Sequence, residues 1–408
     1  MLRKEIEDKL ADRLVSNIEK TNEYILEKIG NAVKEISKLS PSQAYQLGQI
    51  LKYGGSYEEI AKELSKISGK NVQEIYKMFE EVAKNNKQFA KQFYRYRGLD
   101  YIPYRNDTAL KRQVEGLARM TANTYINIAN TRGIGFLFEG LNGQMMFKDI
   151  RQSYYEVIDR SILAISQGKS TFQEEMRKTL KELGHNGLVL YENGHTRRLD
   201  SALRMNMLDG IRQLNQETAN RFGAEYGADG YEISVHIAPA PDHADAQGRQ
   251  FWKADYERLQ NGEAVKDVKN ITRELVHSSN GSYRRIEEYN CYHKAFPIVV
   301  GVSKSEYTDE QLQKIINDNE KGFTYDGKHY TLYEGTQLQR RIETEIRKNK
   351  DTQILARASG DDFKELAQES QAKINMLKDK YDDLCKASGL KPQLDRMSVS
   401  GYRRIKVW

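Results

Sequence analysis

Apolar residues recur every three or four positions over long stretches of this chain, and this spacing constrains its fold more than any other feature. In residues 1–39 they lie at Ile6, Leu10, Leu14, Ile18, Ile25 and Ile29. Such a spacing places them on one face of an α-helix with about 3.6 residues per turn. The same pattern returns in residues 108–128, 150–167, 201–222, 334–358 and 363–386. We therefore expect long amphipathic helices that pack against one another.

The composition agrees with a helix-rich protein and does not name a partner. A length of 408 residues allows about two or three domains. The hydrophobic share is 38%, the charged share is 30% and the mean hydropathy is −0.76, which favours an extended molecule without a large core. The net charge of +6 is spread along the chain, unlike the dense basic face that phosphate binding produces.

Two further features concern the cellular compartment. In the first residues, MLRKEIEDKLADRL, charged positions alternate with apolar ones. A membrane span needs about 20 apolar residues, and no apolar run in the chain approaches that length. We expect a soluble protein that is made in a cytoplasm and does not enter a membrane. Cys291 and Cys385 are the two cysteines, so a disulfide framework is excluded and a reducing compartment is expected.

Residues 56–84 are similar to a helix-turn-helix, with Gly69 at the predicted turn and a second helix from Asn71. A helix that reads DNA should present basic or amide side chains to the groove. Residues 71–84 instead carry Lys77 and Lys84 against three glutamates. This net acidic balance favours an ordinary helical hairpin, and a DNA-binding regulator is kept as an alternative.

The chain changes character near residue 231. Residues 233–237, ISVHI, alternate as a strand does, and the following APAPDH predicts a rigid loop because its two prolines remove backbone donors. Cys291 and His293 lie just ahead of a short apolar strand. Elsewhere, residues 133–144 predict a loop or hairpin, and Asp326-Gly327 predicts a hairpin turn.

Together these patterns predict an α+β protein that is predominantly helical. We divide it into an N-terminal helical region (1–98), a helical domain leading into the core (99–230), a small α+β domain (231–305) and a C-terminal helical region with a basic tail (306–408).

Four side chains that can bind metals gather in the small α+β domain, namely His236, His243, Cys291 and His293. Zinc takes histidine nitrogen and cysteine sulfur as ligands, commonly two from each of two loops. His236 is expected on the strand and His243 on the rigid loop after it. The spacing matches no known zinc finger, so a hydrogen-bonded structural cluster without an ion is the other interpretation.

A nucleophilic site is a further interpretation of the same residues. Cys291 would attack a substrate, His293 or His243 would act as its base, and Asp242 would orient that base. No glycine pair suited to an oxyanion hole follows the cysteine, which disfavours this hypothesis.

Two basic segments lie near the C-terminus. Residues 336–350 carry Arg340, Arg341, Arg347, Lys348 and Lys350. Glu343 and Arg347 are four positions apart, which predicts an ion pair on a solvated helix face. The tail, GYRRIKVW, and this helix have a second interpretation as contacts with packaged nucleic acid or with an acidic partner.

The second half of the chain resembles the phage minor capsid protein 2 family, which is related to the minor head proteins of the phage Mu type. The most specific part of the resemblance is a spaced pattern of His236, Pro241, His243, Gln247, Gly248, Asn290, Cys291 and His293. A second block is similar from Tyr333 to Lys350, and a third includes Asp200, Arg204 and Asn206.

The chain departs from the family pattern at Ala240, Ala246 and Tyr292, where the family usually has an arginine, an aromatic residue and an arginine. A cysteine that the family often has just upstream of Asn290 is also missing from residues 286–289. His236, His243, Cys291 and His293 are therefore the complete candidate ligand set.

The resemblance implies a virion component inside the head near the portal vertex, assembled in the host cytoplasm with the portal protein, the major capsid protein and other head proteins. Its role would be in head morphogenesis, DNA packaging or ejection. It implies no enzymatic activity. The one cofactor expected is zinc, which the His/Cys residues themselves suggest at the candidate set. The alternative is a metal-dependent hydrolase or nuclease that uses the His/Cys cluster and is carried in the virion.

Overall fold

The computed structural model describes residues 4–53, 56–130, 133–140, 142–192, 195–277, 281, 283–288 and 291–407. The protein is 64% helical with small antiparallel sheets, which confirms the predicted α+β class with a predominance of helices. The α-helices are α1 (Lys4–Ile36), α2 (Pro41–Tyr53), α3 (Ser56–Tyr96), α4 (Thr108–Asn130), α5 (Ile150–Ser166), α6 (Lys169–Asn186), α7 (Leu199–Glu225), α8 (Lys253–Leu259), α9 (Asp309–Lys321), α10 (Leu332–Ala358) and α11 (Lys364–Ser388).

The strands are short and form separate sheets. They are β1 (Ile134–Glu139), β2 (Met145–Asp149), β3 (Val189–Glu192), β4 (His195–Arg198), β5 (Gly230–Ile233), β6 (Gln250–Trp252), β7 (Val265–Lys266), β8 (Thr272–Arg273), β9 (Ala295–Ile298), β10 (Phe323–Tyr325) and β11 (Lys328–Tyr330). The largest sheet has the order β2-β1-β3-β4, and a three-stranded sheet has the order β6-β5-β9. The hairpins β1–β2 and β10–β11 confirm the two predicted hairpins.

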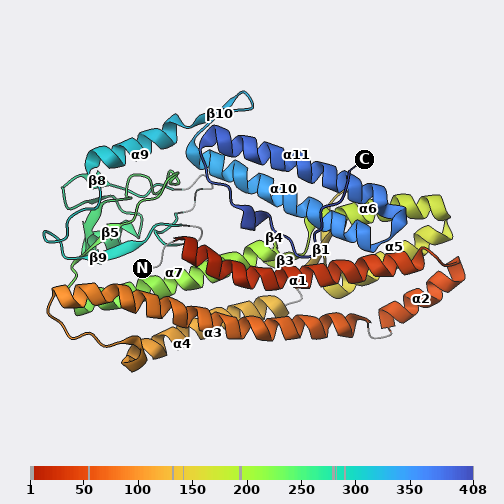
Figure 1. The fold of residues 1–408 in the computed structure, drawn as a ribbon, viewed down its shortest axis with the longest axis horizontal. Coiled ribbons are helices and arrows are strands. Elements are labelled where there is room, and N and C mark those ends of the chain that lie inside the picture. Colours follow the sequence, from red (N-terminus) through yellow and green to blue (C-terminus); the bar gives the residue numbers. More distant parts are fainter. Residues whose placement is uncertain are drawn as a thin grey trace.

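The molecule is elongated (Figure 1). Helices α1, α3 and α7 run along its length, and α10 and α11 form an antiparallel pair beside them. The sheet of β5, β6 and β9 lies with α9 at one end, whereas α2, α5 and α6 lie at the opposite end. No helix in the described ranges combines the length and the apolar character needed to cross a bilayer.

One continuous hydrophobic core joins the long helices, so the expectation that there would be no large core is wrong. The core extends from Leu10 on α1 through Phe79 on α3 and Ile211 on α7, and it also includes Leu355 on α10. The apolar share of the sequence is modest, but the helical spacing collects it on facing sides of neighbouring helices. Burial then depends on the arrangement of apolar residues more than on their number.

Helix α3 is a single helix of 41 residues, so both the predicted hairpin in residues 56–84 and the helix-turn-helix alternative are wrong. Gly69 lies inside the helix, and a Cβ atom there would meet nothing within 4 Å. A glycine in a helix interior costs about 1 kcal/mol relative to alanine. Burial of Ile60, Ile75 and Phe79 outweighs that cost, because each such side chain contributes about 1.5–3 kcal/mol.

A buried ionic network ties α1, β4, α7 and α10 together. Arg198 on β4 donates to Asp200 at the start of α7 (3.1 Å) and to Asp351 on α10 (3.0 Å). Arg347 donates to Asp200 at 2.6 Å, and Asn22 on α1 donates to Asp351 at 3.0 Å. Burial by itself would raise the pKa of Asp200, but Arg198 and Arg347 outweigh it and hold that pKa below its usual range.

The same contacts correct the expected solvated face of residues 336–350. Arg347 pairs with Asp200, while Glu343 is 2% exposed and accepts a hydrogen bond from the Tyr381 hydroxyl at 2.8 Å. The predicted Glu343–Arg347 ion pair is therefore wrong. Lys350 is also buried and donates to the carbonyl oxygen of Met397. This part of α10 packs between neighbouring elements and does not face the solvent as a charged stripe.

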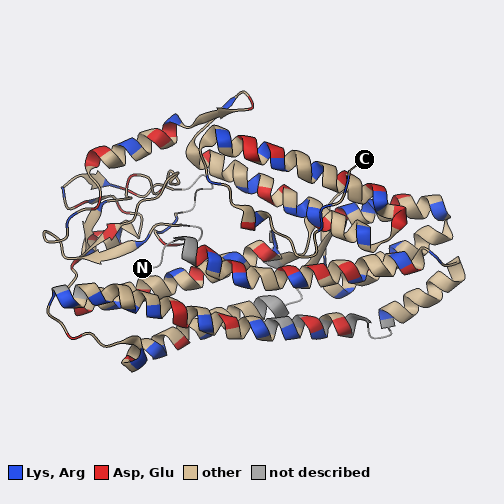
Figure 2. Ribbon diagram, in the orientation of Figure 1, with Lys and Arg blue, Asp and Glu red and all other residues tan. Residues whose placement is uncertain are grey.

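Charges of both signs are interspersed along α1, α3, α10 and α11 (Figure 2). Several exposed pairs are local, such as Lys84 with Glu80 and Lys38 with Glu35. These pairs contribute about 0.3–0.5 kcal/mol each.

We predict that Arg198→Met lowers the free energy of unfolding by about 3–5 kcal/mol, because it leaves two buried carboxylates without their shared cation. Asp351 is 0% exposed and cannot recover its solvation. Chemical denaturation at pH 7 measures the effect. Arg197→Met is the matched control, since Arg197 is an exposed neighbour on the same strand. Equal stabilities of the two variants would contradict the importance of the network.

Candidate metal centre

The pairing of β5 with β9 brings two loops from distant parts of the sequence together. The strands are antiparallel, and Ile233, the last residue of β5, lies opposite Ala295, the first residue of β9. The chain that leaves β5 therefore lies beside the chain that enters β9. The first carries His236 and His243, and the second carries Cys291 and His293.

The loop after β5 is held by its own backbone. Strand β5 ends at Ile233, so the expectation that His236 lies on a strand is wrong. Beyond it, Ala238 takes a positive φ of 58°, and Pro239 and Pro241 have no N–H to continue a ladder. The N–H of His243 donates to the carbonyl oxygen of Ala240 at 3.0 Å. Residues 234–240 form no helix or strand, so the chain after β5 is a loop, as the two prolines predicted.

Gly248 closes this loop. Its φ is +71°, and its N–H donates to the carbonyl oxygen of Ile233 at 2.8 Å. A Cβ atom at this position would lie 2.3 Å from a methyl carbon of Leu312 on α9. A side chain is therefore excluded both by the backbone conformation and by the close approach of α9.

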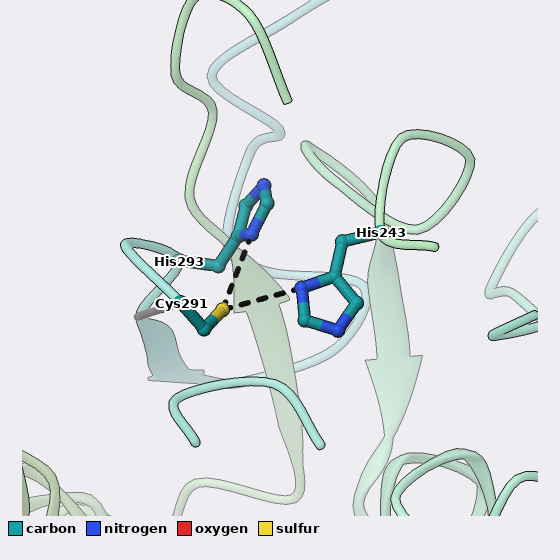
Figure 3. A group of neighbouring side chains, drawn as sticks. All are labelled: His243, Cys291 and His293. Atoms are coloured by element: carbon teal, nitrogen blue, oxygen red, sulfur yellow. Dashed lines mark hydrogen bonds between the residues drawn. The ribbon is translucent and has the colours of Figure 1, made fainter. Parts of the chain in front are cut away.

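Cys291 lies between the two histidine rings (Figure 3). Its Sγ is 3.2 Å from Nδ1 of His243 and 3.4 Å from Nδ1 of His293. The ligand atoms of the three residues all lie within 4.8 Å of one another. A tetrahedral zinc ion with bonds of about 2.3 Å to sulfur and about 2.0 Å to nitrogen separates these ligand types by about 3.5 Å. The three residues are thus spaced to hold a metal ion.

The outer nitrogens of both rings face oxygen acceptors. Nε2 of His243 lies 2.8 Å from the carbonyl oxygen of Arg284, and Nε2 of His293 lies 3.2 Å from Oε1 of Gln247. Each Nε2 therefore carries the proton and donates it, which leaves the lone pair of Nδ1 directed toward Cys291. Histidines that bind metals are usually oriented by such outer hydrogen bonds.

Asp242 orients this arrangement through Arg284. The Arg284 guanidinium donates to both carboxylate oxygens of Asp242, at 2.9 and 2.7 Å. The carboxylate is 3.8 Å from Nε2 of His243, so it is not the direct partner of that ring. Asp242 therefore does not orient the base directly, as the sequence had predicted. It positions Arg284, whose carbonyl oxygen accepts the hydrogen bond from His243.

Burial sets the protonation of the three residues. The His243, Cys291 and His293 residues are 1%, 2% and 2% exposed. Loss of solvation lowers the pKa of His293 well below its usual value, lowers the pKa of His243, and raises the pKa of Cys291 to about 11. The imidazoles are therefore neutral, as metal ligands must be. A buried thiol with a raised pKa is a poor nucleophile, which argues against the nucleophilic interpretation.

His236 lies next to the cluster but is not one of the three residues whose ligand atoms converge. Its ring contacts the ring of His293 in a tilted arrangement, with centroids 4.1 Å apart and an interplanar angle of 37°. Its Nδ1 lies 3.1 Å from the carbonyl oxygen of Ile237. The structure thus brings three of the four candidate ligands together and places the fourth at their edge.

Sequence reasoning missed most of the surroundings of the cluster. Arg284 lies in a polar stretch without a motif, and Arg340 and Arg396 come from α10 and from the short 3₁₀ helix Leu394–Met397. All three line a cavity of about 220 Å³ beside the cluster. Two signals in the sequence included Arg340, namely the basic segment 336–350 and the similarity of residues 333–350 to the family pattern, but neither placed it beside the cluster.

The fold and the site define a predominantly helical α+β protein with a buried His-Cys-His cluster at the end that carries the small sheet. The family model of phage minor capsid protein 2 matches residues 4–386, and the chain belongs to this family. No curated protein and no solved structure matches the chain. The match confirms the resemblance seen in the second half and extends it over the N-terminal helices. Asn290 of the motif lies outside the described residues.

Membership supports a structural role in a phage particle, with other proteins of the head as partners. The cluster of His243, Cys291 and His293 is able to hold a metal ion.

Glu287 holds the chain that enters β9, and its pKa allows this role to be tested by measuring stability at different pH values. Its carboxyl group accepts a hydrogen bond from the N–H of Ala295 at 2.9 Å, and its own φ is +73°. Burial raises the pKa of Glu287 from 4.5 to about 8, despite Lys294 nearby. Between these two pH values the folded protein binds a proton that the unfolded chain has lost, so stability falls as the pH rises.

We predict that Glu287→Gln removes this loss. Glutamine keeps an oxygen acceptor for Ala295 and stays neutral, so the variant should match the natural protein at pH 5 and exceed its free energy of unfolding at pH 8. Denaturation at the two pH values measures the difference. Glu288→Gln, at the neighbouring half-buried position, is the control. If Glu287→Gln and Glu288→Gln changed the free energy of unfolding equally between pH 5 and pH 8, the assignment of the pH dependence to Glu287 would be contradicted.

Proposed function

We propose that this protein is a portal-proximal component of a phage head, acts in head morphogenesis, and binds the portal protein and the major capsid protein during assembly. The observation that carries the proposal is an apolar groove between the long helices and the small sheet, in a chain of the phage minor capsid protein 2 family. The groove supplies a surface on which a partner can bury apolar side chains. The division of the chain into the four regions predicted from the sequence also remains a proposal.

The groove has a volume of about 720 Å³. Its walls are α3, α7, β9 and the turn after β9, which contribute Phe89, Phe222, Phe296 and Val302. Val302 is 60% exposed and Phe89 is 47% exposed. Exposed apolar side chains around a hollow are typical of protein interaction sites. A helix or short segment of the portal protein that inserts apolar side chains is the partner that this lining fits.

Residues with charges of both signs surround the groove. Arg97, Lys304, Glu232 and Glu306 contribute to its lining. This mixture suits a protein partner, whose own surface carries both signs, better than it suits the uniformly negative backbone of DNA. Contact of the C-terminal tail with packaged DNA, DNA packaging and ejection remain less supported, because the charged residues are interspersed along the helices (Figure 2).

We predict that Val302→Glu weakens binding to the portal protein at least tenfold, because a carboxylate would be buried in an apolar hollow. The measurement is the dissociation constant for the purified portal protein, together with incorporation into heads. Val276→Glu is the matched control, since Val276 is 43% exposed and does not line the groove. Unchanged affinity and incorporation in Val302→Glu would contradict this docking surface.

We also propose that the His-Cys-His cluster binds zinc. Two neutral imidazoles and a thiol that deprotonates on binding form a ligand set that zinc accepts. The ion would then crosslink the loop after β5 to the segment before β9. His236, the fourth residue of the set predicted from the sequence, lies at the edge of this cluster with its ring against that of His293.

The zinc proposal predicts one equivalent of zinc per chain by metal analysis, and its loss in Cys291→Ser. Thermal stability should also fall when a chelator removes the ion, because binding to the folded state alone stabilises it. Cys385→Ser is the matched control: Cys385 is buried on α11, where it contacts Gln339 and not the cluster. Equal zinc content in the two variants would contradict the assignment.

The alternative of a hydrolase or nuclease has less support. Hydrolysis by a metal site usually needs a carboxylate or another base beside the bound water. The described residues that line the cavity next to the cluster include no aspartate or glutamate. The arrangement is therefore better suited to holding a ligand or a loop than to activating water.

A further inference from the structure

The cavity beside the cluster is lined by side chains that suit an anion. Its lining includes the three clustered residues, Arg284, Arg340 and Arg396, together with the hydroxyl-bearing Tyr292, Tyr333 and Thr336. Its volume is about 220 Å³, below the range of about 300–1,000 Å³ typical of drug-sized ligands. The described lining residues include three arginines and no carboxylate, and two of these arginines, Arg340 and Arg396, have no ion pair among the described residues, which favours an anion.

The three arginines differ in how they are already paired. Arg284 is neutralised by Asp242, with which it makes two hydrogen bonds. Arg396 donates to the Tyr292 hydroxyl at 3.1 Å, and the carboxylates of Glu343 and Asp8 act on it electrostatically without an ion pair among the described residues. The side chain of Arg340, partly buried on α10, also interacts electrostatically with Glu343, whose carboxylate accepts its hydrogen bond from Tyr381 instead. A partly buried guanidinium without a hydrogen-bonded acceptor among the described residues is a suitable site for an oxyanion.

We propose that this cavity binds a phosphate group, held by Arg340, by Arg396 and by the metal ion at the His243–Cys291–His293 cluster. The proposal rests on the metal centre proposed above. A tetrahedral ion held by these three protein ligands would have one position left for a further ligand, and all three residues line this cavity. An anion in the cavity would then be able to contact the ion as well as the two guanidinium groups.

Phosphate suits these groups better than a carboxylate does. Arg340 lies on α10 and Arg396 on the 3₁₀ helix Leu394–Met397, so the two guanidinium groups come from different elements. A planar carboxylate is matched by one arginine in a two-point contact. A phosphate carries up to two negative charges and presents oxygens in several directions, so it can accept from both arginines and also contact the ion.

The test uses the full-length, zinc-loaded protein titrated with inorganic phosphate in a calorimeter. Arg340→Gln should weaken phosphate binding about tenfold to a hundredfold, the range of a charge-assisted hydrogen bond. Arg341→Gln should bind as the natural protein does, since Arg341 is the exposed neighbour on the same helix and does not line the cavity. Equal phosphate affinity of the Arg340 and Arg341 variants would overturn the proposal.

A cobalt-loaded sample separates the two proposals. Phosphate should shift its visible absorption spectrum, because the ligands of the ion change. Metal bound in full without any effect of phosphate on spectrum or heat would overturn the phosphate site and leave the metal centre intact. Phosphate binding that depends on Arg340 in a protein that binds no metal would overturn the metal centre and support the arginine part of the site.

The phosphate can be a free ion or the end of a nucleic acid. A second binding experiment therefore compares a 5′-phosphorylated oligonucleotide with the same oligonucleotide bearing a 5′-hydroxyl. A preference for the phosphorylated form that disappears in Arg340→Gln supports a nucleic-acid end as the source. Binding of inorganic phosphate without such a preference supports the free ion. Failure of both probes to bind would overturn the proposal.

Discussion

Burial of facing apolar stripes in one continuous core is the constraint on which the rest of the molecule depends. Leu10 on α1, Phe79 on α3, Ile211 on α7 and Leu355 on α10 belong to the same cluster, so helices far apart in the sequence are fixed relative to one another. This close packing allows Arg198, Asp200 and Asp351 to meet in the interior. Buried charges of this kind specify one alignment of the helices, because any shift would leave a charge unpaired.

The candidate site follows from a much smaller interaction, the pairing of β5 with β9. That register sets Ile233 opposite Ala295 and so places the loop with His243 against the segment with Cys291 and His293. Helix α7 supports β9 from the other side, where the Tyr226 hydroxyl donates to the carbonyl oxygen of Pro297 at 2.8 Å. The cluster is therefore attached to the helical core, and binding of an ion would stabilise that core as well.

A structural role and a ligand site are compatible in one head protein. The groove along α3, α7 and β9 and the cavity beside the cluster share one stretch of chain, since β9 contributes to the groove and the segment just before it to the cavity. A bound ion that orders this segment would also order one wall of the groove. The proposed metal binding and the proposed partner binding would thereby be linked through a shared segment of chain, since a ligand that stabilises one state favours any other ligand that prefers it.

Local spacing in the sequence determined the helices and the hairpin turns, because the helical repeat and turn chemistry act over a few neighbouring residues. The spaced motif around the histidines and Cys291 carried the resemblance to the family. It also identified His243, Cys291 and His293. Local spacing predicted the wrong outcome at Gly69 and for the Glu343–Arg347 pair, where burial of Phe79 and the pairing of Arg347 with Asp200 override local preference. Only the tertiary structure decided that Arg284, Arg340 and Gln247 surround the cluster and that His236 lies at its edge. These contacts join residues separated by dozens of positions, and their geometry depends on strand register and helix packing, which no local pattern encodes.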